Sequence, residues 1–170
     1  MPFWRNYYHL VWATKNREPF ITSDIEPRLF AYIIRISAEL GAYVYAINGW
    51  TDHTHVVTAI PPHVAVSHWV KHVKGASSHD LNQQGLPFHF GWQRGYGVLT
   101  LGQRQRPDAE AYVHRQKEHH AQNTINAWLE RYDEIDEGPS DAVGGQPPPV
   151  PALREPSPSY GMPNDSPFPF

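Results

Sequence analysis

Four short segments of aromatic and β-branched residues, interrupted by longer segments with helical periodicity, restrict this chain to a small number of folds. The predicted strands cover residues 7–14, 42–49, 53–60 and 95–102. The predicted helices cover residues 23–41, 64–82 and 106–134. The order β-α-β-β-α-β, followed by a last helix, is that of a ferredoxin-like split βαβ. We therefore predict an α+β fold with an antiparallel sheet, two helices on one face and a third helix free to cover the other.

Local signals set the expected ends of these segments. Ser23 and Glu26 stand at the spacing of a capping box, which predicts that the first helix opens there. Asn48 and Gly49 form a hairpin signal, so we expect the chain to reverse at this pair between the second and third strands. Pro107 fits the first turn of the last helix.

Residues 138–170 differ in composition from the rest of the chain. They contain ten of the seventeen prolines and little that could form a periodic apolar face. We predict a disordered tail with polyproline II tendency, serving as a solubilising segment or as an SH3-like ligand, and a folded domain at residues 1–137. Charge is segregated as well, because residues 1–129 carry a net charge of +3 and residues 130–170 carry −6.

Composition excludes several classes of protein. The chain has no cysteine, so neither disulfides nor a thiolate metal site can form. It has no apolar run long enough to span a bilayer, and its first residues lack the pattern of a secretory signal. We expect a soluble cytoplasmic protein with no membrane partner.

His53 and His55 lie one residue apart in the predicted third strand. Alternate residues of a strand point to the same face, ~7 Å apart along the chain, so the two imidazoles can converge on one ion. Two half-buried histidines satisfied by hydrogen bonds would give the same pattern. A metal site would need a third ligand from elsewhere in the chain.

The last predicted helix offers such a ligand. Tyr112 and Gln116 are four residues apart and share one helix face, and His119 and His120 continue close to the same stripe. Tyr112 alone would fit a core aromatic. However, a polar stripe on the inner side of a helix costs desolvation free energy unless it has partners, and a histidine pair on the facing sheet would supply them.

At these residues the chain resembles the single-tyrosine HUH transposases, which comprise the insertion-sequence-200-like enzymes and the REP-associated tyrosine transposases. The resemblance spans most of residues 4–130 and is carried by the motifs YHLVWATKNREPFI, DHTHVV, GWQRGYGVLTLG and YVHRQKEHH. The ending QKEHH is closer to the REP-associated branch. Thr54 departs from the bulky hydrophobic residue that is usual in the family, but it is β-branched and suits a strand.

The resemblance implies a DNA transposase that cleaves and rejoins single-stranded DNA near hairpins. His53, His55 and Gln116 would hold one Mg²⁺ or Mn²⁺ that polarises the scissile phosphate, and Tyr112 would attack that phosphate. The expected products are a 5′-phosphotyrosine and a free 3′-OH, so the strand can be rejoined to another end without ATP. Family members occur as monomers and as homodimers in which the tyrosine helix serves the partner's histidines. A protein of this kind would associate with the nucleoid when acting.

Contacts to DNA would come from basic and aromatic side chains. The candidates for the DNA backbone are Lys71, Lys74, Arg94, Arg104 and Arg106, and those for base stacking are Trp69, Trp92 and Tyr96. Each of these could equally be a solvated surface charge or a core aromatic. The candidates for a general base are Lys117 and His120.

Two rival functions also fit parts of the sequence. One is a domesticated, non-catalytic protein that binds DNA hairpins. The other is a metal-dependent hydrolase that uses the histidines on a small substrate, which would leave Tyr112 and the WQRGYG segment without a role. A covalent adduct between protein and DNA would separate these functions from that of a transposase.

Overall fold

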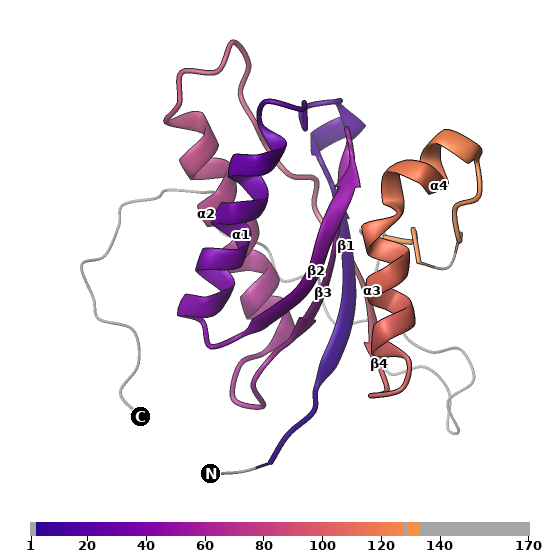
Figure 1. The fold of residues 1–170 in the computed structure, drawn as a ribbon. Coiled ribbons are helices and arrows are strands. Elements are labelled where there is room, and N and C mark those ends of the chain that lie inside the picture. Colours follow the sequence, from indigo (N-terminus) through magenta and orange to yellow (C-terminus); the bar gives the residue numbers. More distant parts are fainter. Residues whose placement is uncertain (1–2, 128, 133–170) are drawn as a thin grey trace, which may run out of the picture. The chain divides into compact units, whose positions relative to one another are not determined.

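The computed structural model describes residues 3–127 and 129–132, which form an antiparallel sheet with helices on both faces (Figure 1). The strands are β1 (Tyr7–Ala13), β2 (Tyr43–Trp50), β3 (His53–Ala59) and β4 (Gly97–Leu101). They pair in the order β2-β3-β1-β4, and every pairing is antiparallel. The predicted α+β class and the ferredoxin-like strand arrangement are therefore confirmed.

Helices α1 (Glu26–Glu39) and α2 (Val66–Asn82) cover one face of the sheet and close the main core (Figure 1). Leu29 and Ile33 of α1 are fully buried there, in the same apolar cluster as Trp12 of β1. Trp69 of α2 is also fully buried and meets Trp12 edge to face, with ring centroids 6.1 Å apart. Of the two roles that the sequence left open for Trp69, the structure supports that of a core aromatic, because its ring is enclosed in the protein core.

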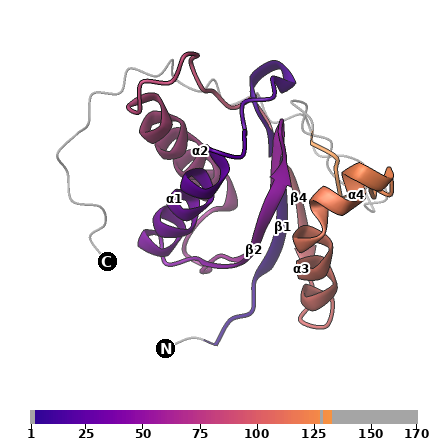
Figure 2. The same cartoon turned by 45° about the horizontal axis from the view of Figure 1, so that its top comes forward.

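Helix α3 (Arg106–His114) and the short helix α4 (Gln116–Gln122) lie on the opposite face (Figure 2). Ala109 and Val113 of α3 pack on Ala46 and Val57 of the sheet in a second, smaller apolar cluster. Val57 alternates along β3 with residues that face the main core. As a result, all seven residues of β3 are buried between two layers of helices.

Two predicted element ends differ from the structure. Helix α1 begins at Glu26, without a side-chain cap, because residues 22–25 form a turn and no capping box is made. Strand β2 continues to Trp50, and the chain reverses at Thr51 and Asp52, so the predicted turn at residues 48–49 is wrong. Gly49 instead permits close approach of the paired strand, since a Cβ there would lie 2.2 Å from the His53 carbonyl oxygen.

The predicted long helix over residues 106–134 is also wrong. Arg115 leaves helical geometry with φ −93° and ψ 12°, which separates α3 from α4. Asn123 ends α4 in the left-handed conformation with φ 54° and ψ 40°, which asparagine tolerates better than most residues. The following segment, up to Tyr132, is irregular and returns toward the sheet (Figure 1).

The predicted tail at residues 138–170 lies outside the described residues, so the domain boundary after residue 137 stays a prediction. Within the part of the chain that is described, every helix is too short or too polar to cross a membrane.

Candidate active site

Strand register brings three histidines to the sheet face that carries α3. In the pairing of β1 with β3, Val11 stands opposite His55 and Ala13 opposite His53. His9, two residues before Val11, projects from the same face because strand side chains alternate. His9, His53 and His55 are all buried, with at most 1% of their surface exposed. The predicted strand and the shared face of His53 and His55 are confirmed.

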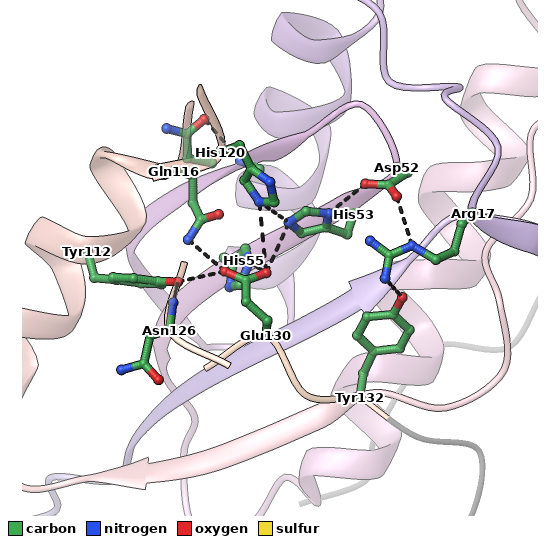
Figure 3. Close-up of polar contacts among 12 residues, drawn as sticks. Arg17, Asp52, His53, His55, Tyr112, Gln116, His120, Asn126, Glu130 and Tyr132 are labelled. Carbon is green, nitrogen blue, oxygen red and sulfur yellow. Dashed lines mark hydrogen bonds and ion pairs between the residues drawn. The ribbon is translucent and has the colours of Figure 1, made fainter. Parts of the chain in front are cut away.

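His53 is oriented by a carboxylate beside it. Its Nδ1 lies 2.7 Å from Oδ1 of Asp52, and Oδ2 of Asp52 accepts a hydrogen bond of 2.8 Å from Arg17 (Figure 3). Burial would raise the pKa of Asp52, but the hydrogen bonds from His53 and Arg17 lower it to about 2. A carboxylate on Nδ1 leaves Nε2 of His53 directed into the site, which is the arrangement common for metal-binding histidines.

His55 is oriented by a second buried imidazole. Its Nδ1 lies 2.9 Å from Nε2 of His9, and the two rings stack with centroids 5.1 Å apart. Burial and the neighbouring His55 lower the pKa of His9 to about 3, so His9 is neutral at physiological pH. A neutral His9 can accept the Nδ1 proton of His55, which again leaves Nε2 free to face the site.

Tyr112 and Gln116 approach from the helical side, and both bind a residue that the sequence did not indicate (Figure 3). Tyr112 Oη donates a 2.6 Å hydrogen bond to Oε1 of Glu130, and Gln116 Nε2 donates one of 3.3 Å to the same oxygen. Oε2 of Glu130 lies 3.0 Å from His55 Nε2 and 3.3 Å from His53 Nε2. Glu130 therefore joins the tyrosine to the histidine pair.

The electrostatics of this cluster favour an ionised carboxylate and a protonated tyrosine. Burial would raise the pKa of Glu130, but hydrogen bonds from His53 and His55 hold it far below its usual range. Burial and the hydrogen bond to Glu130 raise the pKa of Tyr112 to about 12. Burial would lower the pKa of His53, yet its bonds to Asp52 and Glu130 raise it.

The donor set suits a divalent cation. His120 Nε2 lies 3.1 Å from His53 Nε2, and one donor atom each from His53, His120 and Glu130 fall within 4.8 Å of one another. Gln116 is fully buried, and its Oε1 has no hydrogen-bond partner. A buried amide oxygen without a partner is costly, and a cation beside the histidines would satisfy it. The residues present thus fit a bound metal ion.

The family follows from comparison with known proteins, because a family model described as Transposase IS200 like matches residues 2–116. The chain belongs to the IS200-like transposase family. It is 26% identical to the ISDra2 transposase TnpA of Deinococcus radiodurans over 115 residues, which are 64% of this chain and 82% of that protein. It is 27% identical to the transposase for insertion sequence element IS200 of Salmonella typhimurium over 121 residues, 68% of this chain and 79% of that protein.

A solved structure shares the fold of this transposase. The REP-associated tyrosine transposase bound to a REP hairpin superposes with a TM-score of 0.55 at 15% sequence identity. The match covers 75% of this chain and 76% of the other. Membership of a transposase family implies a DNA-cleaving enzyme.

The basic residues predicted to contact DNA occupy different environments in this transposase. Lys71, Arg94 and Arg104 are exposed. Lys74 donates hydrogen bonds of 2.6 and 3.0 Å to the carbonyl oxygens of Gln93 and Gly95, which holds the WQRGYG segment in place. The Arg106 guanidinium lies 4.1 Å from the ring centroid of Tyr45. The structure thus gives Lys74 and Arg106 intramolecular contacts, and DNA binding by all five residues stays a prediction.

The remaining aromatic and general-base candidates also have defined partners. Trp92 is partly buried, and its Nε1 donates a hydrogen bond of 3.0 Å to Ser77. Lys117 forms an ion pair with Glu26. His120 bonds to His53 and stacks on Trp50 with ring centroids 5.2 Å apart.

Sequence reasoning missed His9, Asp52 and Glu130. Asp52 could have been found, because an acidic residue directly before a candidate metal-binding histidine is a natural partner for its Nδ1. His9 could be placed only once the register of β1 against β3 was known. Glu130 was hidden inside the predicted long helix, although Asn123 is a residue type that often ends one.

Proposed function

We propose that this transposase cleaves and rejoins single-stranded DNA beside hairpins, with Tyr112 as the nucleophile. The observation that carries the proposal is the meeting of Tyr112, Gln116, His53 and His55 in one cluster linked by Glu130 (Figure 3). A core aromatic would not direct its hydroxyl at a carboxylate held by two imidazoles. Family membership and the hairpin-bound structural relative support DNA as the substrate.

His53, His55 and Gln116 would hold Mg²⁺ or Mn²⁺, and the bound ion would supply positive charge to polarise the scissile phosphate. Asp52 and His9 fix the two imidazoles so that both Nε2 atoms face the phosphate site. Because Asp52 and His9 already hold the two histidines in place, these side chains need little rearrangement during the reaction.

Tyr112 then forms the covalent intermediate. Its Oη bonds to phosphorus, the bond from phosphorus to O3′ breaks with its electron pair on O3′, and O3′ takes a proton from solvent. The hydrogen bond of 2.6 Å to Oε1 of Glu130 orients the hydroxyl, and the tyrosine proton is transferred to solvent, because a carboxylate whose pKa lies far below its usual range is a poor proton acceptor. Because the pKa of Tyr112 is about 12, we expect this transfer to accompany the attack rather than precede it.

Trapping of the covalent adduct tests the proposal. Wild-type protein with Mn²⁺ and a labelled single strand flanking a hairpin should form a protein–DNA adduct, which mass spectrometry should map to Tyr112. Tyr112→Phe should bind the same DNA without forming an adduct. Tyr32→Phe is the matched control, because Tyr32 lies on α1, beyond the other face of the sheet, and should leave the adduct unchanged. Hairpin binding without any adduct by the wild type would instead assign the chain as a non-catalytic hairpin-binding protein.

A further inference from the structure

Glu130 occupies a position that the predicted metal site did not include. Its Oε2 atom is approached by three imidazole nitrogens, at 3.0 Å from His55 Nε2, 3.3 Å from His53 Nε2 and 4.0 Å from His120 Nε2. In addition, the Nε2 atoms of His53 and His120 are 3.1 Å apart. We propose that Glu130 and His120 are metal ligands, so that the ion is held by a carboxylate and three imidazoles as well as by Gln116.

The spacing of these donor atoms supports the proposal. Ligands ~2.1 Å from an octahedral ion lie ~3.0 Å apart when adjacent and ~4.2 Å apart when opposite. The three short separations, which involve His53, His55, His120 and Glu130, have the values of adjacent ligands. The 4.0 Å separation of His120 Nε2 from Glu130 Oε2 is close to that of opposite ligands. The donor atoms of His53, His120 and Glu130 therefore have separations that a single ion could span.

Hydrogen bonds alone explain the cluster less well. His53 and His120 place two ring nitrogens against each other, and both also face the same carboxylate oxygen. Because Nδ1 of His53 and of His55 already donates a proton to Asp52 and His9, protons on both Nε2 atoms would make two neighbouring rings cationic, which is unfavourable. A cation at this point satisfies all the nitrogen lone pairs and the carboxylate together.

The segment that carries Glu130 is built into the fold. Tyr112 Oη accepts a hydrogen bond of 3.0 Å from the Asn126 backbone N–H, and Tyr132 bonds to Arg17, which itself holds Asp52 (Figure 3). Gly97 of β4 makes room for this segment, because a Cβ there would lie 1.8 Å from the Arg131 carbonyl oxygen. These contacts on both sides of Glu130 fix the position of its backbone and thereby direct its side chain into the site.

The proposed ligand set has a consequence for the choice of metal. Three imidazoles favour transition-metal ions over Mg²⁺, which prefers oxygen ligands. We expect Mn²⁺ to bind the full-length protein more tightly than Mg²⁺ does. This inference rests on the proposed function only in that a divalent ion enters the site.

Calorimetric titration of the full chain with Mn²⁺, without DNA, tests the inference. Glu130→Gln and His120→Ala should each weaken Mn²⁺ binding by about tenfold or more, the scale on which supporting residues of metal sites act. Glu118→Gln is the matched control, since it removes the same charge from an exposed position on α4 and should leave the affinity unchanged. Circular dichroism of each variant should match that of the wild type.

Other results would overturn the inference. Mn²⁺ affinity of Glu130→Gln within twofold of the wild type, or tighter, would show that Glu130 only fills the site until substrate displaces it. An equal loss of Mn²⁺ affinity in Glu118→Gln would show that the effect comes from the net charge of the protein and not from coordination by Glu130. The proposed function fails separately: Mn²⁺ binding that depends on Glu130, without any adduct at Tyr112, would leave the ligand assignment intact and remove the nucleophile.

Discussion

The hydroxyl of Tyr112 donates a hydrogen bond of 2.6 Å to Oε1 of Glu130, although the two residues lie on opposite sides of a helix break. The same hydroxyl accepts the backbone N–H of Asn126. Tyr112 therefore anchors residues 124–132, the segment that carries Glu130, through contacts with both Asn126 and Glu130. Its proposed role in chemistry is accompanied by a structural role that can be measured separately.

We predict that Tyr112→Phe loosens this segment while the domain stays folded. The variant loses two hydrogen bonds at a partly exposed site, so the free energy of unfolding should fall by roughly 1 kcal/mol. Amide hydrogen exchange over residues 124–132 should accelerate, and exchange in β1 and β3 should not. Unchanged exchange in residues 124–132 would show that other contacts hold the segment.

Metal removal should stop cleavage without unfolding the protein. The two apolar clusters that hold the sheet and helices together contain none of the proposed metal ligands, so EDTA should leave the circular dichroism spectrum native. The double variant His53→Ala, His55→Ala should likewise fold, bind little Mn²⁺ and leave DNA uncut. His63→Ala, on an exposed loop, is the control and should retain cleavage. Cleavage by the double variant at the wild-type rate would remove this site from the mechanism.

The order of strands and helices along the chain could be predicted, because hydrophobic periodicity and turn residues act locally. The shared face of His53 and His55 follows from strand alternation alone. The turn at Thr51 and Asp52 could not be predicted, because Asn48 and Gly49 are an equally good turn signal when only the local sequence is considered. The structure places Gly49 inside β2 because the neighbouring strand passes too close for a side chain, and that is a tertiary constraint.

The candidate site was predictable only in part, for a related reason. Tyr112 and Gln116 lie four residues apart, and both reach the site despite the break at Arg115. Glu130 arrives because α4 ends at Asn123 and the chain turns back, which no periodicity in the sequence revealed. His9 depends on the pairing of strands that are far apart in the sequence.

The DNA substrate should be a single strand next to a hairpin rather than a plain duplex. Tyr112 must reach one phosphate in line, and a stacked duplex restrains the backbone that would have to turn toward it. Cleavage assays with matched sequences, one carrying a palindrome with a flanking single strand and one a blunt duplex without a palindrome, should differ by at least about tenfold. Equal cleavage of both substrates would show that the substrate assignment is wrong.

Truncation after Glu137 should leave folding and cleavage nearly unchanged. Ten prolines in residues 138–170 remove backbone donors, so this segment has little capacity to form a packed core. Thermal unfolding of the truncated and full-length chains should give melting temperatures within a degree or two of each other, roughly the range of neutral surface changes. A large fall in melting temperature would show that the tail packs on the domain.

Stability of the metal-free protein should fall in mildly acidic solution because of His9. Burial and His55 lower the pKa of His9 to about 3, whereas a histidine in the unfolded chain has a pKa of about 6.5. Below pH ~6.5 the unfolded state therefore binds a proton that the folded state does not. The stability that His9 contributes is complete above pH ~6.5 and is lost progressively toward pH ~3. His53, whose pKa is raised, acts in the opposite direction, so a comparison with a His9 variant is needed.

The comparison is between wild type and His9→Gln, both in EDTA, by thermal unfolding from pH 7.5 to pH 5.0. Glutamine keeps an acceptor for the Nδ1 proton of His55 but does not titrate. The wild type should melt at the higher temperature at pH 7.5, and its advantage should shrink steadily as the pH falls. This range lies above the titration of carboxylates such as Asp52, whose pKa is about 2, so their protonation does not interfere. His63→Gln, at an exposed position, should follow the wild type throughout. A difference in melting temperature between wild type and His9→Gln that stays constant over this pH range would mean that His9 takes up its proton equally in the folded and unfolded states. His9 could then no longer be regarded as the neutral acceptor beside His55.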